Sequence, residues 1–143
     1  MNPSNLASPF LSAARAAPRR VALSIGGNST SYGELARFAG RIASWLLRSS
    51  VDGHVGVFAQ RSATAYAGVL GACMAGRPWV PIGVDLPVER QLTLMQRGGV
   101  RLLIADRAVN PRFCEAGALA VLCPENLSEL DALEPLERPR SVA

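Results

Sequence analysis

The stretch MAGRPWVPIGVDLP, at residues 74–87, contains the signals of a helix end, a short strand and a helix start. Gly76 suits the left-handed conformation that ends many helices. Trp79–Ile82 predicts a brief buried strand, because the prolines beside and within it fit only at strand ends or where no ladder donor is needed. We expect Asp85 to cap the next helix, with Pro87 in its first turn. The stretch therefore predicts strands that alternate with helices.

The residues before this stretch predict a strand followed by a helix. Residues 55–59 form a short apolar run of the kind that makes strands covered on both faces. Larger side chains recur on one face of the helix that ends at Gly76, at Tyr66, Val69, Leu70, Cys73 and Met74. Small residues line much of the remaining surface, at Ala65, Gly68, Gly71, Ala72 and Ala75. We expect close packing on both sides of this helix.

The N-terminal region predicts a helix and then a small hairpin. Ser8 is expected as the N-cap and Pro9 as the first position of a short Ala-rich helix that closes near Pro18. Strands over Val21–Ile25 and residues 29–31 are then joined by a tight turn of sequence GGN.

A second helix is expected to begin where this hairpin ends. Ser31 and Glu34 have the spacing of a capping box, in which each side chain binds a free main-chain N–H of the first turn. Apolar residues follow at helical spacing, at Leu35, Phe38, Ile42 and Trp45.

After Pro87 the pattern continues with a helix, a strand, a weaker helix and a last strand. The first of these helices ends at the Gly98-Gly99 pair, and its apolar face is formed by Val88, Leu92 and Met95. Residues 100–106 and 119–122 are the expected strands, with the weak helix at 111–116. Strands spaced in this way are largely parallel and have right-handed crossovers. The predicted fold class is α/β: a largely parallel sheet flanked by helices, with a small N-terminal β-hairpin.

Length and composition indicate one globular domain. The chain has 143 residues, of which 49% are hydrophobic and 18% charged. Residues 1–123 are expected to form the domain, and residues 124–143 an acidic and then Pro/Arg-containing tail. The sequence shows neither a membrane span nor a secretion signal, so a cytoplasmic location is expected. The net charge of +4 comes from scattered arginines, which argues against nucleic-acid binding.

Three cysteines, at Cys73, Cys114 and Cys123, are too few and too widely spaced for a disulfide framework or a metal site. We expect all three to be small buried residues.

The search for chemically active residues leads to no assignment. The lone histidine, His54, has only Asp52 nearby as an orienting carboxylate, and is expected to be a partly exposed loop residue. Trp45 and Trp79 are expected in the core. Capping and helix-dipole effects explain Asp85 and Glu89. The Gly26-Gly27 pair is explained by the hairpin turn. No residue is predicted to be catalytic, cofactor-binding or metal-binding.

Two motifs resemble a known family. TSYGEL at residues 30–35 and MAGRPWVPIGVDLPVER at residues 74–90 resemble, in order and spacing, the first two core motifs of adenylation domains of nonribosomal peptide synthetases, in the adenylate-forming ligase superfamily. The chain departs from the family pattern at Met74, where lysine or alanine is common, at Gly83, where aspartate is usual, and at Val84, where proline often follows.

The resemblance implies an incomplete part of the large N-terminal subdomain of such an enzyme. The complete enzyme would use ATP and Mg²⁺ to turn an amino acid into an acyl-adenylate, and would then transfer the acyl group to a carrier thiol. The family's phosphate loop and catalytic lysine lie beyond positions matched here, and all fifteen basic residues of this chain are arginine. The implied role is scaffold, inactive alone, with no cofactor bound by this segment. The implied partners are the C-terminal remainder of the domain and a carrier protein or condensation domain.

Two alternatives stay open at this point. One is a non-catalytic interaction module of a peptide synthetase complex. The other is an unrelated small α/β domain that binds a ligand at the carboxyl ends of its strands.

Overall fold

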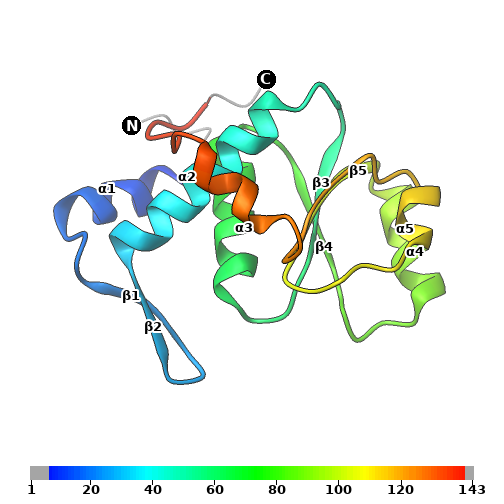
Figure 1. Cartoon of the computed structure of the whole chain (residues 1–143), viewed down its shortest axis with the longest axis horizontal. Helices are drawn as coiled ribbons and strands as arrows, with labels where there is room; N and C mark the ends of the chain where they lie inside the picture. Colours follow the sequence, from blue (N-terminus) through cyan, green and yellow to red (C-terminus); the bar gives the residue numbers. More distant parts are fainter. Residues whose placement is uncertain (1–6, 141–143) are drawn as a thin grey trace.

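The strands form two separate sheets in the computed structural model, which describes residues 7–140 (Figure 1). The first sheet is an antiparallel hairpin of β1 (Val21–Ile25) and β2 (Asn28–Ser31). The second is parallel, in the order β4-β3-β5-β6. Its strands are β3 (His54–Phe58), β4 (Trp79–Ile82), β5 (Val100–Ala105) and β6 (Ala120–Leu122). The predicted α/β class, with a parallel sheet and a small hairpin, is confirmed.

Helices cover both faces of the parallel sheet. The helices of the fold are α1 (Ser8–Ala16), α2 (Tyr32–Arg48), α3 (Ala63–Met74), α4 (Val88–Arg97), α5 (Arg112–Glu115) and the 3₁₀ helix η1 (Leu127–Ala132), and α1 and η1 pack chiefly on α2. One buried cluster joins α2 and α3 to one face of the sheet, through residues such as Ile42 and Ile104. A second cluster joins α4 and α5 to the other face, through residues such as Met95 and Phe113. Figure 1 shows these two groups of helices on opposite sides of the sheet.

The predicted capping box is formed at the start of α2. The main-chain N–H of Ser31 donates to Glu34 Oε1 at 3.0 Å, and the N–H of Glu34 donates to Ser31 Oγ at 3.1 Å. Hydrogen bonding to the Glu34 carboxylate by Ser31, chiefly by its main-chain N–H, lowers the pKa of that carboxyl from its ordinary value. The box fixes the point where the hairpin becomes a helix.

Replacement of the capping hydroxyl should weaken the fold measurably. Ser31→Ala removes the acceptor for the Glu34 N–H, so we expect the free energy of unfolding to fall by about 1 kcal/mol, as for other N-cap deletions. Urea denaturation followed by circular dichroism measures this change. Ser29→Ala is the matched control, since Ser29 is an exposed residue of the same strand. Equal losses in the two variants would contradict the capping role.

The small-residue surface of α3 packs closely, as expected. Its buried residues are Ala67, Gly68, Gly71, Ala72 and Met74. An added Cβ at Gly71 would lie 2.7 Å from Ile42 Cγ2 and 2.9 Å from the main-chain oxygen of Ala39, so α2 and α3 are in direct backbone contact. The other face of α3, which carries the larger side chains, is not fully covered, since Tyr66 is 40% exposed.

Trp79 is not a core residue, contrary to the prediction. Its side chain is 37% exposed, because β4 is an edge strand of the sheet. Of the four residues of β4, only Ile82 is fully buried. The sequence pattern indicates an apolar strand but carries no information on strand order. Gly76 does adopt the expected left-handed conformation, with φ of 71°.

Two predicted helix caps are wrong. The N-cap of α4 is Pro87, with no side-chain cap, and the Asp85 side chain instead accepts a hydrogen bond from Gln60. The N-cap of α1 is Ala7, so Ser8 is the first helical residue. In both cases a proline near the helix start fixes the backbone without help from a capping side chain.

The cysteines are free thiols, but one of them is exposed. Cys114 lies on the exposed side of the short helix α5, contrary to the expectation that all three are buried. Cys73 is half-buried, and its burial raises the pKa of its thiol despite a hydrogen bond with Trp79.

Residues 133–140 cross over the helices on the α2 side of the sheet. Ser44 Oγ donates to the Glu134 oxygen at 2.6 Å, and the Leu136 N–H donates to the Gly40 oxygen at 2.9 Å. The Arg140 N–H donates to the Met74 oxygen at 2.7 Å. This segment therefore contacts both α2 and the end of α3. Within residues 7–140, no helix combines the length and apolar character needed to cross a bilayer.

Candidate functional site at the carboxyl edge of the sheet

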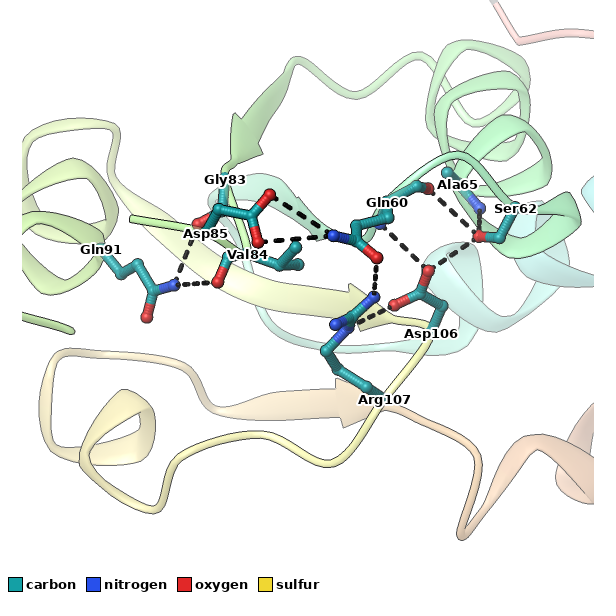
Figure 2. Close-up of polar contacts among 9 residues, drawn as sticks. All are labelled: Gln60, Ser62, Ala65, Gly83, Val84, Asp85, Gln91, Asp106 and Arg107. Atoms are coloured by element: carbon teal, nitrogen blue, oxygen red, sulfur yellow. Dashed lines mark hydrogen bonds and ion pairs between the residues drawn. The ribbon is translucent and has the colours of Figure 1, made fainter. Parts of the chain in front are cut away.

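Three loops meet where the parallel strands end. The loops follow β3, β4 and β5, which are neighbours in the sheet, so their first polar residues lie close together (Figure 2). In open α/β sheets, this edge is where ligands usually bind. The residues that meet here are Gln60 and Ser62 after β3, Asp85 after β4, and Asp106 and Arg107 after β5.

Asp106 is the centre of this group. Its Oδ2 accepts hydrogen bonds from the Gln60 N–H at 3.1 Å and from Ser62 Oγ at 2.9 Å. Its Oδ1 lies 2.9 Å from Nε of Arg107. Ser62 is also the N-cap of α3 and accepts from the Ala65 N–H at 3.1 Å. The carboxylate thus ties the end of β5 to the start of α3.

Gln60 connects this carboxylate to the loop after β4. Its Nε2 lies 3.4 Å from both carboxylate oxygens of Asp85, and its Oε1 accepts from Arg107 Nη2 at 3.1 Å. On the far side of that loop, Nε2 of the buried Gln91 donates to the Gly83 oxygen at 2.9 Å. Figure 2 shows the continuous chain of contacts from Ser62 to Asp85.

The environment of Asp106 favours its charged form. Partial burial acts to raise the pKa of its carboxyl, but the hydrogen bonds from Arg107, Ser62 and Gln60 together outweigh this effect. The pKa is therefore lower than its ordinary value. With both oxygens accepting hydrogen bonds, the carboxylate acts as a structural anchor for the loops after β3 and β5, not as a proton carrier.

Asp106→Asn should lower stability in a pH-dependent way. A carboxyl whose pKa is depressed in the folded state stabilises the fold above its unfolded pKa, and loses this contribution as the pH falls through the folded pKa. We expect a loss of about 2 kcal/mol at pH 7, typical of hydrogen bonds to a charged group. The difference from the wild type should shrink steadily below about pH 4, the ordinary aspartate pKa. Urea denaturation at a series of pH values measures it.

Asp85→Asn is the control for this experiment, because Asp85 has only the long contacts with Gln60. We expect a change within about 0.5 kcal/mol at each pH, as for most surface substitutions. A loss in the Asp106 variant that stays constant from pH 7 to pH 2 would contradict the anchoring role of the charge.

The structure separates His54 from this site. His54 begins β3, at the amino ends of the parallel strands, and its Nδ1 lies 2.7 Å from the Gly98 oxygen. It is exposed, as expected, but it is the first residue of a strand and not a loop residue. Gly26 and Gly27 have φ of 57° and 83° and form the hairpin turn. Trp45 packs against the core around α2.

Asp85 and Glu89 also do not form a pair. Glu89 Oε1 lies 2.7 Å from Nη1 of Arg112, in an exposed ion pair between α4 and α5 that raises the pKa of the guanidinium. Within residues 7–140, no group of three histidine, cysteine, aspartate or glutamate side chains is placed to hold a metal ion.

Gln60, Ser62, Asp106 and Arg107 were not singled out from the sequence. A usable signal was present, because each stands within four residues of the end of a predicted buried strand. What sequence alone could not supply is that β3 and β5 are neighbours, which brings residues 44 and 46 positions apart into contact.

Comparison with known proteins establishes the family. The model of the family described as AMP-binding enzyme matches residues 10–141, which is nearly the whole chain. The chain belongs to the AMP-binding enzyme family. This match, together with the relatives described next, confirms the likeness to adenylation domains of peptide synthetases seen in the two motifs, and it favours neither of the two alternatives.

Individual relatives agree with this family. Gramicidin S synthase 2 of Brevibacillus brevis is 31% identical over 130 residues, which are 88% of this chain and 3% of that protein. The crystal structure of IdnL7 is 34% identical with a TM-score of 0.80, over 99% of this chain and 31% of the other. The N-terminal subdomain of Klebsiella oxytoca NpsA, 24% identical, has the same fold with a TM-score of 0.73, over 93% of this chain and 35% of the other. The chain spans only a small part of the length of these relatives.

Proposed function

We propose that the chain is the N-terminal scaffold of an amino-acid-activating adenylation domain. The observation that carries the proposal is the match of residues 10–141 to the AMP-binding enzyme family, together with 31% identity to gramicidin S synthase 2. In the complete enzyme, the reaction joins a carboxylate to the AMP part of ATP, releases pyrophosphate, and then passes the acyl group to a carrier thiol.

The residues of this chain do not fit ATP and Mg²⁺ by themselves. A triphosphate is usually held by a glycine-rich loop with a lysine, and this sequence has neither. At the carboxyl edge, the Asp106 carboxylate is already bound by Gln60, Ser62 and Arg107. We therefore assign the groups that bind ATP and Mg²⁺ to other polypeptide of the complete enzyme.

The contribution of this chain is a rigid support. The contacts among Gln60, Asp85, Asp106 and Arg107 join the three loops in one network. Such a surface can position neighbouring catalytic segments, because its polar side chains are joined to one another by hydrogen bonds. The partners proposed here are the remainder of the adenylation domain and a carrier protein or condensation domain. A cytoplasmic location is also part of the proposal, since free cysteines suit a reducing compartment.

A hybrid enzyme tests this function. The full 143-residue chain replaces the matching segment of IdnL7, and ATP–pyrophosphate exchange is measured with a panel of amino acids and other carboxylic acids. We expect carboxylate-dependent exchange in the hybrid. The same hybrid can be assembled from two separately expressed polypeptides, which tests whether covalent continuity is needed.

The controls are this chain alone and the remainder of IdnL7 alone, both of which should be silent. A folded hybrid that is silent with every acid, in both the fused and the mixed form, would overturn the proposal. Exchange activity in the 143-residue chain alone would also overturn it, because the chain would then not be a scaffold.

A further inference from the structure

The hairpin β1–β2 stands apart from the parallel sheet. It contains only two strands, and no hydrogen-bonded strand neighbour joins it to β3–β6 in the described part of the chain. Its contacts with the rest of the fold are made chiefly through α2. An isolated two-stranded hairpin is at best marginally stable in water. The hairpin is therefore the element of this fold that would gain most from an added strand.

The edges of the parallel sheet are poor places for strand addition. The Val55 N–H donates to the Pro78 oxygen. In this parallel ladder the main-chain N–H and C=O groups of Val80 and Ile82 therefore point toward β3, while those of Trp79 and Pro81 point to the open edge. Pro81 thus removes a donor from the open edge of β4. The other edge strand, β6, has three residues. Proline and short length are the usual means by which proteins protect sheet edges.

The hairpin has neither kind of protection. Ile25 and Asn28 pair across the two-residue Gly26-Gly27 turn, and the next pair is Ser24 with Ser29. In an antiparallel ladder every second pair turns its main-chain groups outward, which places the outward groups on Ser24 of β1 and Ser29 of β2. Both residues are exposed, and neither strand contains a proline or a charged residue.

An apolar groove lies beside β1 and not beside β2. Its volume is about 550 Å³, and its walls include Ala22 and Leu23 of β1 and Tyr66, Val69 and Leu70 of α3. Residues of β2 do not contribute to its lining, and Arg61 is the one charged residue that does. Tyr66 is among the most exposed large hydrophobic residues in residues 7–140. The groove suits uncharged side chains that project from an extended segment next to β1.

We propose that β1 is the docking edge for an extended strand of the polypeptide that completes the enzyme. This strand would bond to the outward main-chain groups of Ser24 and place its apolar side chains against Tyr66, Val69 and Leu70. The inference rests on the proposed function, which supplies the occupant: this chain spans 31% of IdnL7, so about two thirds of a comparable enzyme lies outside it. Because Arg61 is the one charged residue in the lining of the groove, we expect the docked strand to carry apolar and not charged side chains.

Hydrogen exchange resolved to single amides tests the docking. The Ser24 N–H should exchange rapidly in the 143-residue chain and at least about 100-fold more slowly in the IdnL7 hybrid, because a bonded amide exchanges only after local opening. The Ser29 N–H, on the opposite edge, is the internal reference and should change much less. Rapid exchange of the Ser24 N–H in a folded hybrid overturns the docking proposal.

Matched proline variants provide a second readout. Ser24→Pro and Ser29→Pro each remove one outward N–H and leave the bonded pairs of the hairpin intact. We expect Ser24→Pro to lower the melting temperature of the hybrid well below that of the Ser29→Pro hybrid, while the two variants of the 143-residue chain melt alike. Equal effects of the two prolines in the hybrid contradict the assignment to β1.

The wall of the groove is tested by Tyr66→Asp. The charged side chain should weaken association between this chain and the separately expressed remainder of IdnL7 by at least tenfold. Leu119→Asp is the control, since Leu119 is 60% exposed and is not part of the groove. Equal affinities for the two variants would contradict docking in the groove.

The remaining outcomes separate the two proposals. If the hybrid catalyses ATP–pyrophosphate exchange but its Ser24 N–H still exchanges hydrogen rapidly, the docking proposal alone is overturned. If the Ser24 N–H is protected from hydrogen exchange but the hybrid has no ATP–pyrophosphate exchange activity, the proposed function alone is overturned. A hybrid that does not fold cooperatively contradicts both. Protection of Ser24 in the 143-residue chain by itself, together with a dimer in sedimentation, identifies a second copy as the occupant and overturns the proposal.

Discussion

Gly71→Ala should destabilise the protein by about 2 kcal/mol, because overpacking a tight contact costs more than the helix gains from alanine. The added methyl group would lie 2.9 Å from the main-chain oxygen of Ala39 and 2.7 Å from Ile42 Cγ2. Ile42 is fully buried and the Ala39 oxygen is part of α2, so neither can move without separating the two helices. Gly71→Val should be more damaging. Urea denaturation followed by circular dichroism measures both variants.

Gly68→Ala is the matched control on the same helix. A Cβ at Gly68 would meet Ile104 Cγ2 at 3.2 Å, which is a tight contact but with a side chain and not with backbone. Because alanine is favoured over glycine within a helix by about 1 kcal/mol, we expect a net change close to zero. If both alanine variants were equally stable, the backbone contact between α2 and α3 would not have the importance assigned to it.

Removal of the Arg77 side chain should have an effect of similar size. Its guanidinium donates to the oxygens of Val51 at 2.9 Å, Gly53 at 3.3 Å and Leu46 at 3.3 Å. These three carbonyls belong to the end of α2 and to the loop that leads into β3. Arg77→Ala leaves all three without this donor, and we expect a loss of about 2–3 kcal/mol, as for other hydrogen bonds to a charged group.

Two further variants separate geometry from charge. Arg77→Lys keeps the charge but lacks the planar set of donors, so it should recover only part of the loss. Arg97→Ala removes an exposed arginine from the end of α4 and should change the free energy of unfolding by no more than about 0.5 kcal/mol. Complete recovery with lysine would show that charge alone, and not the shape of the guanidinium, holds the loop.

Local signals allowed much of the fold to be predicted. The hairpin turn, the Ser31–Glu34 capping box and the alternation of strands with helices depend on residues close in sequence, so pattern and spacing were sufficient. The close packing of α3 was also foreseeable, since small residues recur along its surface.

The errors concern properties that depend on distant residues. Trp79 was expected in the core, but its exposure follows from the place of β4 at the sheet edge, which no local pattern specifies. Asp85 has the spacing of a cap, yet its side chain contacts Gln60, 25 positions earlier. The polar group around Asp106 was missed for the same reason, because it exists only through the order of the parallel strands.

Pro81 also matters before the chain has folded. Without it, the apolar β-prone residues around Trp79 could stack with identical segments of other unfolded molecules, the first step toward amyloid-like aggregates. A proline interrupts such stacking because it cannot donate a main-chain hydrogen bond. The same ring that removes one outward donor from β4 in the native sheet therefore also acts as a safeguard during synthesis and refolding.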